Sequence, residues 1–254
     1  MTAFTLTLPE VDVLAQTLDA DIRRFPFDIP SFGEFERDRQ RLAREVFADL
    51  SRRGLIRGAV IDPDLTRAFR VLARPVITVA VMGTVESARK LYARAATNGE
   101  TGVLAVKDGD RLRVELIRPT ALAVTLVGLL PNVAAGPGQS VTITRPAEDN
   151  HQDDVLTPVH SGGGNEHQMR IAAGYLARPR TGTGFFSVSG RDRRTGKELR
   201  AGNLTWLDTD AGRYLTLARP VRSDGQVRTT FSPADSTRLV LTLGEMIESV
   251  APAR

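Results

Sequence analysis

One order of sequence elements occurs twice in this chain. Leu72–Pro75 and Leu176–Pro179 both read Leu-Ala-Arg-Pro, and each follows a helix-forming stretch and precedes strand-forming residues. Proline cannot continue a helix and restricts the residue before it, so both motifs mark a change from helix to strand. The sequence therefore predicts two copies of one plan, about residues 1–131 and 138–250, joined through residues 131–138.

The strands of the second copy are the most distinct. Short runs of strand-forming residues are separated by turn formers such as Ser-Asp-Gly, which predicts a four-stranded antiparallel meander. The runs are Phe185–Ser189, Asn203–Asp208, Arg213–Ala218 and Val227–Phe231. A helix is expected next, with Ser232 as its cap, Pro233 at its first position and Asp235 in a capping box. Its apolar stripe consists of Leu239, Leu243, Ile247 and Val250.

The first copy is expected to follow the same plan. Its predicted strands are Arg89–Ala96, Thr101–Lys107 and Arg111–Ile117, followed by a helix from Pro119 to Leu130. Helical spacing of apolar residues predicts further helices upstream, over Pro9–Leu18, over Ser31–Arg53 before Gly54, and from Asp62 to the first Leu-Ala-Arg-Pro motif.

These elements predict an α+β protein with a central antiparallel β-sheet of two quasi-two-fold-related repeats flanked by helices. A single domain over residues 1–254 is expected, because pairing the two copies would cover apolar surface that each leaves exposed. Residues 131–165 form a Gly/Pro-rich polar linker in this interpretation.

Composition excludes several classes of function. The chain has no cysteine, which removes disulfides, thiolate nucleophiles and cysteine-ligated metals. The N-terminus has no basic segment before its apolar residues, and the longest apolar run, Ala121–Leu130, is too short to span a membrane. We therefore expect a cytoplasmic protein, with no membrane partner.

The residues that suggest a metal site lie together but in an unfavourable pattern. His151, His160 and His167 occur beside Asp153, Asp154 and Glu166. Their spacing matches no helical pair, and Gly-rich flanks are more typical of a linker than of rigid metal ligands. We expect no metal site.

Catalytic motifs are also missing from the sequence. Asp208 and Asp210 are paired carboxylates beside Arg213, but turn formation and a pairing of Arg213 across the hairpin explain them better. We predict no enzyme, no catalytic residue and no cofactor.

One alternative stays open, a DNA-binding regulator, because residues 42–72 superficially resemble the helices of a winged helix and the net charge is +4. Arg67 and Arg70 are the only basic residues of its recognition helix, so no nucleic-acid partner is preferred.

Two motifs lie close together in the C-terminal third. Leu204–Ala218 reads LTWLDTDAGRYLTLA, and residues 230–239 read TFSPADSTRL. With the first Leu-Ala-Arg-Pro motif and the residues from Val103 to Asp110, they resemble the EspG family, which is associated with ESX (type VII) secretion in actinobacteria. This resemblance covers most of the chain. The residues that match the family pattern are Asp208, Thr209, Gly212, Arg213, Tyr214, Pro233, Ala234, Asp235, Arg238 and Leu239. The resemblance implies a cytoplasmic chaperone that binds PE–PPE heterodimers at the helical tip of the PPE subunit, keeps them soluble and delivers them to the secretion machinery without hydrolysing nucleotide.

Two polar turns are the predicted contacts with the partner. They contain Val85 and Glu86 in the first copy, and Ser223, Asp224 and Gln226 in the second. Both interrupt predicted strands with polar residues. The expected partner is a PE–PPE-type heterodimer, bound by a monomer or weak homodimer of this chain.

Overall fold

The protein is built on one ten-stranded antiparallel sheet. A computed structural model describes residues 2–146, 166–192, 194–221 and 226–251. Read across the sheet, the strands are β1 (Ala3–Thr7), β7 (Arg111–Ile117), β6 (Gly102–Asp108), β5 (Arg89–Thr97), β4 (Ile77–Val85), β9 (Arg180–Arg191), β10 (Glu198–Thr209), β11 (Gly212–Val221), β12 (Gln226–Pro233) and β8 (Val141–Pro146). A separate small hairpin joins β2 (Ile56–Arg57) and β3 (Val60–Ile61).

The strand order confirms both predicted meanders. Strands β4 to β7 lie side by side in chain order, and so do β9 to β12. The two sets meet where β4 pairs with β9, while β1 and β8, each the first strand of its half, lie at the outer edges. Both Leu-Ala-Arg-Pro motifs lie at the predicted transition from helix to strand, one between α3 and β4 and the other between α5 and β9.

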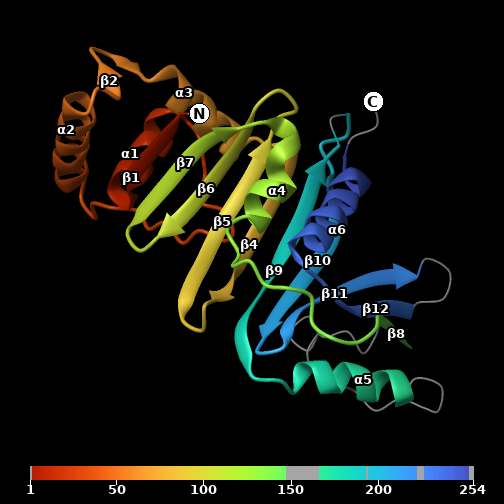
Figure 1. Cartoon of the computed structure of the whole chain (residues 1–254). Coiled ribbons are helices and arrows are strands. Elements are labelled where there is room, and N and C mark those ends of the chain that lie inside the picture. Colours follow the sequence, from red (N-terminus) through yellow and green to blue (C-terminus); the bar gives the residue numbers. More distant parts are fainter. Residues whose placement is uncertain (1, 147–165, 193, 222–225, 252–254) are drawn as a thin grey trace.

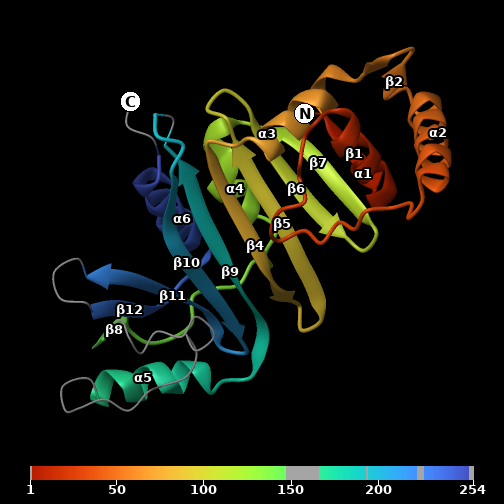
Figure 2. The same cartoon turned by 180° about the vertical axis from the view of Figure 1, so that it is seen from behind.

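Helices lie on both faces of the sheet but cover them unequally (Figures 1 and 2). The helices are α1 (Leu8–Thr17), α2 (Glu36–Arg52), α3 (Pro63–Ala73), α4 (Leu122–Val127, after the 3-10 turn Pro119–Ala121), α5 (Glu166–Leu176) and α6 (Ser236–Ser249). Helices α4 and α6 pack side by side over the middle of one face. On the other face α1 and α3 cover the β5–β7 side, and α5 covers β8.

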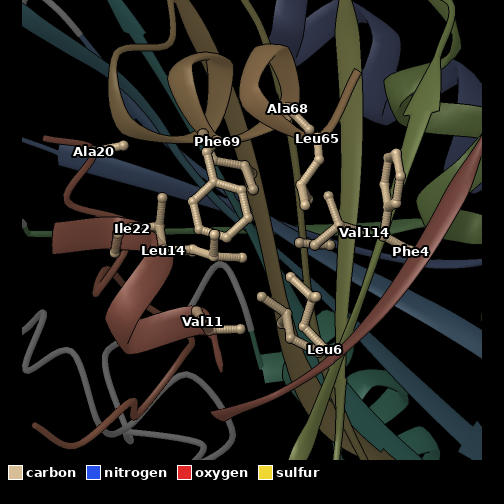
Figure 3. Close-up of a cluster of buried hydrophobic side chains, with 14 of the residues drawn as sticks. Phe4, Leu6, Val11, Leu14, Ala20, Ile22, Leu65, Ala68, Phe69 and Val114 are labelled. Carbon is tan, nitrogen blue, oxygen red and sulfur yellow. The ribbon is translucent and has the colours of Figure 1, made fainter. Parts of the chain in front are cut away.

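Alternation along the strands gives each face its own core. Phe69 and Leu65 of α3 pack with Leu14 of α1 against the face that carries Val114 (Figure 3). The opposite face packs on α4 and α6 through a second cluster that includes Trp206 of β10. One sheet therefore holds together two large cores with separate helical covers, and a smaller third cluster packs under α5.

A pair of glycines allows the two halves to approach closely. Gly83 of β4 pairs with Gly184 of β9, and the indole ring of Trp206 lies across them. A Cβ atom on Gly184 would overlap this ring and the carbonyl oxygen of Met82. The packing of Trp206 thus requires glycine at the junction.

The start of the last helix differs from its prediction. Asp235, not Ser232, caps α6 and accepts a hydrogen bond from the Arg238 amide at 2.8 Å. Ser232 and Pro233 belong to β12, because pairing with β11 continues as far as the Tyr214–Pro233 pair. Backbone pairing therefore extends the strand through the predicted cap.

Two other helices are shorter than predicted. Helix α2 begins at Glu36 instead of Ser31, and Gly54 follows it with φ +73°, as a C-terminal glycine should. The predicted helix from Pro119 to Leu130 is a 3-10 turn followed by the six residues of α4.

Candidate functional site

Arg213, the centre of the family pattern, has a structural role. Its side chain is fully buried and donates from Nε and Nη2 to the two carboxylate oxygens of Asp208, at 2.5 and 2.9 Å. Nη2 also donates to the Pro131 carbonyl oxygen at 2.9 Å, and Nη1 to Ser236 Oγ at 3.4 Å. One guanidinium thus joins the β10–β11 hairpin, the connection between the halves and the start of α6. The predicted pairing across the hairpin is confirmed, while Asp210 lies exposed in the turn.

The neighbouring pattern residues hold the same connection. Tyr214 stacks on Tyr175 of α5 with ring centroids 4.4 Å apart and donates to the Pro137 carbonyl oxygen at 3.0 Å. Tyr175 in turn donates to the Gln139 carbonyl oxygen at 2.8 Å. Burial raises the pKa of Tyr214, so its phenol stays protonated as a donor.

The remaining pattern residues form turns and caps. Thr209 Oγ1 donates to the Gly212 carbonyl oxygen at 2.8 Å, and Gly212 adopts φ +127° where a Cβ atom would overlap Gly136. Ala234 is buried and donates its amide to the Arg213 carbonyl oxygen. The pattern therefore stabilises the fold, and the candidate binding surface lies elsewhere.

None of the helices in the described ranges lies over the middle of the sheet face opposite α4 and α6 (Figure 2). Tyr92, Met82 and Phe185 are direct neighbours on β5, β4 and β9, so their side chains form a row on this face. All three are partly exposed. Phe25, from the segment between α1 and α2, stacks on Phe185 at 5.9 Å and is 49% exposed. We call these four residues the aromatic band.

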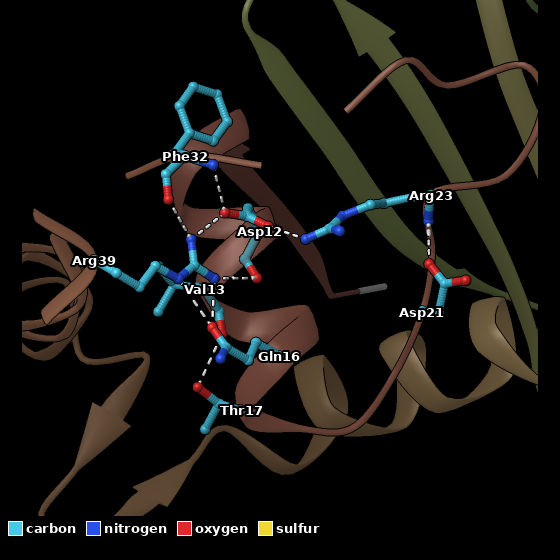
Figure 4. Close-up of polar contacts among 8 residues, drawn as sticks. All are labelled: Asp12, Val13, Gln16, Thr17, Asp21, Arg23, Phe32 and Arg39. Atoms are coloured by element: carbon cyan, nitrogen blue, oxygen red, sulfur yellow. Dashed lines mark hydrogen bonds and ion pairs between the residues drawn. The ribbon is translucent and has the colours of Figure 1, made fainter. Parts of the chain in front are cut away.

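A buried ion-pair network positions the segment that carries Phe25 (Figure 4). Asp12 of α1 has a fully buried side chain and accepts hydrogen bonds from Arg23, Arg39 and the Phe32 amide. Arg23 and Phe32 lie on either side of Phe25 in this segment. This network could not be predicted from the sequence, because Asp12 lies within a helical pattern and both arginines are distant along the chain.

A cavity of about 680 Å³ adjoins the aromatic band. Phe25 lines it, together with Arg94 of β5 and the small side chains of Thr78, Ala80 and Ser187. Arg94 is only 3% exposed, and its Nη2 donates a hydrogen bond to Thr78 Oγ1 at 3.2 Å. Burial, together with the smaller effect of the Arg24 charge, lowers the pKa of Arg94 to about 10, so Arg94 remains a cation at neutral pH.

The structure places the predicted contact residues in different environments. Val85 is fully buried at the end of β4, so its side chain faces the core instead of a partner. Glu86 is exposed beside it, with φ +51° and a 3.0 Å ion pair to Arg89. Gln226 is exposed at the start of β12. Ser223 and Asp224 lie outside the described residues. Contact with a partner stays a prediction for Glu86 and Gln226.

The residues considered for a metal or for DNA do not form such sites in the described ranges. His151, His160, Asp153 and Asp154 lie outside these ranges. His167 and Glu166 lie exposed at the start of α5, and no group of three potential metal ligands occurs among described residues.

Helix α3 does not have the surroundings of a free recognition helix. Its apolar side, with Leu65 and Phe69, packs into the first core, and Arg67 pairs with Asp64 at 2.9 Å. No helix in the described part of the chain is long and apolar enough to cross a membrane.

The fold and the buried pattern residues define an α+β protein with one antiparallel sheet and helices on both of its faces. The sequence profile of the EspG family matches residues 7–245, and the chain belongs to this family. A similar solved structure is the type VII secretion system chaperone EspG5 of Mycobacterium tuberculosis, in complex with the PE25–PPE41 dimer. The matched chain of that structure is 15% identical to this protein in sequence, with a TM-score of 0.68. The match covers 99% of this chain and 97% of the matched chain. No curated protein matches the sequence significantly.

Proposed function

We propose that this protein is a cytoplasmic chaperone of type VII secretion that binds a PE–PPE-type heterodimer. The central observation is the uncovered middle of the sheet with its aromatic band, because a partly exposed apolar row on a rigid sheet suits the apolar tip of a helical partner. Membership of the EspG family and the likeness to EspG5, which was solved with a PE–PPE dimer, support this partner. The partner docks through the helical tip of its PPE subunit, remains soluble and is released at the secretion machinery without nucleotide hydrolysis.

The proposal includes one domain made of two repeats, residues 1–131 and 138–250, related by a quasi-two-fold rotation about the β4–β9 pair. The order of the strands supports it, because each half runs from an outer first strand to a meander that begins at the junction. In this arrangement the docking face spans both halves, so neither half binds the partner alone. The surroundings of α3 disfavour the DNA-binding alternative, because its apolar side packs into the first core and Arg67 pairs with Asp64.

Co-expression with the PE–PPE pair encoded nearby tests the function. The wild-type chain is expected to co-purify with the heterodimer, and Phe25→Asp to weaken the complex about tenfold or more, since an aromatic contact at the centre of an interface carries much of the affinity. Phe35→Asp is the matched control, because Phe35 is 67% exposed at the start of α2, outside the aromatic band. Titration calorimetry measures the dissociation constants of the wild-type chain and of the two variants for the heterodimer. A wild-type chain that binds no such heterodimer, or loss of binding in Phe35→Asp alone, contradicts the proposal.

A further inference from the structure

Among the described residues Arg94 is a buried cation without an ion-pair partner, and Asp21 attracts it only from beyond ion-pair distance. A guanidinium has five N–H donors, yet Nε and Nη1 of Arg94 have no hydrogen-bond acceptor among the described residues. Within these residues no carboxylate lies at ion-pair distance from it either. A buried charge is costly unless it is paired, so this arrangement is unfavourable in the free protein.

The surroundings of Arg94 leave space for a ligand. Ala80 and Ser187 continue the row of Arg94 across β4 and β9, in direct register. Their side chains are small, whereas the next row consists of Tyr92, Met82 and Phe185. The cavity of about 680 Å³ lies over the small side chains, with Arg94 in its wall. It is large enough to admit an acidic side chain.

The charge of the cavity selects for an anion. Its lining contains Arg24, Arg74, Arg191 and Arg200 besides Arg94, but only two acids, Asp192 and Glu198.

Both acids are already engaged. Asp192 accepts hydrogen bonds from the amides of Arg194 and Thr195, both at 2.8 Å, and Glu198 pairs with Arg200 at 3.1 Å. Neither acid forms an ion pair with Arg94, so the described residues leave this charge open to an added carboxylate.

We propose that this cavity binds one carboxylate, supplied by an acidic side chain of the docked PE–PPE-type partner. This inference rests on the proposed function. Phe25 belongs to both the aromatic band and the cavity wall, so a helical tip lying on the band can extend an Asp or Glu side chain towards Arg94. The band then supplies apolar contact, and the buried pair selects a partner with an acid at the matching position.

Arg94→Met tests the site in the complex, because methionine retains most of the aliphatic stem and removes the charge. We expect its dissociation constant for the PE–PPE heterodimer to rise at least about 30-fold. Arg41→Met is the control, since Arg41 is an exposed arginine on α2 with a surface ion pair to Asp38, and we expect less than a twofold change. Changing the acids of the partner's tip to amides, one at a time, is expected to identify one whose loss is not additive with Arg94→Met.

The free chain gives a second readout that a merely structural arginine would not show. Because Arg94→Met removes an unpaired buried charge, the Tm of the free chain is expected to stay the same or rise by about 2–4 °C. A wild-type affinity of Arg94→Met overturns the carboxylate site and leaves the proposed function standing. A fall in Tm of more than about 4 °C also overturns the site, because it would mean that Arg94 is already partnered in the free chain. A wild-type chain that binds no heterodimer overturns the proposed function and the site together.

Discussion

Arg213→Met is expected to lower the free energy of unfolding by about 3–5 kcal/mol, and the Tm by roughly 10 °C. The substitution leaves the Asp208 carboxylate, whose side chain is 2% exposed, without its cation. It also removes the donor to the Pro131 carbonyl oxygen and the contact with Ser236. The connection between the halves and the start of α6 then lose a shared anchor. Chemical denaturation with urea, followed by tryptophan fluorescence, measures the change.

Two controls separate the buried pair from a general effect of losing an arginine. Arg219→Met acts on the same strand, but Arg219 and its partner Glu245 are 61% and 67% exposed, so the expected loss is below about 1 kcal/mol. The double variant Asp208→Leu/Arg213→Met is expected to recover at least half of the stability, because no unpaired charge remains. A double variant less stable than Arg213→Met would show that the charge of Asp208 is not the cause.

Asp12→Ala is the second substitution with a large expected effect. It should lower the free energy of unfolding by about 3 kcal/mol or more. It leaves Arg39, whose side chain is 16% exposed, and the Phe32 amide without their acceptor. Arg23 also loses its carboxylate, so the segment between α1 and α2 is released on both sides of Phe25. We therefore expect weaker partner binding as well as lower stability, measured by denaturation and by calorimetry with the heterodimer.

Asp38→Ala provides the comparison for Asp12. Asp38 pairs with Arg41 on α2, and the side chains are 44% and 69% exposed. The expected loss is below about 0.5 kcal/mol, with unchanged partner binding. If Asp12→Ala were as mild as Asp38→Ala, the network in Figure 4 would not hold the segment in place.

Features with local causes could be predicted from the sequence. The prolines of both Leu-Ala-Arg-Pro motifs end helices for a local reason, and the meanders follow from alternating runs and turn formers. Asp208 and Arg213 are five residues apart across a tight hairpin, so their pairing was visible in the sequence.

Features with distant causes were missed. Asp12 accepts hydrogen bonds from arginines 11 and 27 residues away, and the helical pattern around Asp12 does not predict these contacts. The start of α6 was misplaced because Pro233 pairs with Tyr214 on a neighbouring strand. The site at Arg94 depends on which part of a sheet face the helices leave open. Alternation of side chains along β5 predicts on which face of the sheet Arg94 lies. It does not predict which part of that face is covered, because the covering helices come from other parts of the chain.

Docking of the partner on the open sheet face can be tested directly by hydroxyl-radical footprinting of the complex. Side-chain oxidation is measured by mass spectrometry with and without the PE–PPE heterodimer. We expect Phe25, Met82, Tyr92 and Phe185 to become protected, while Phe35 reacts equally in both states. Protection of Phe35 with unchanged oxidation of the aromatic band would contradict it.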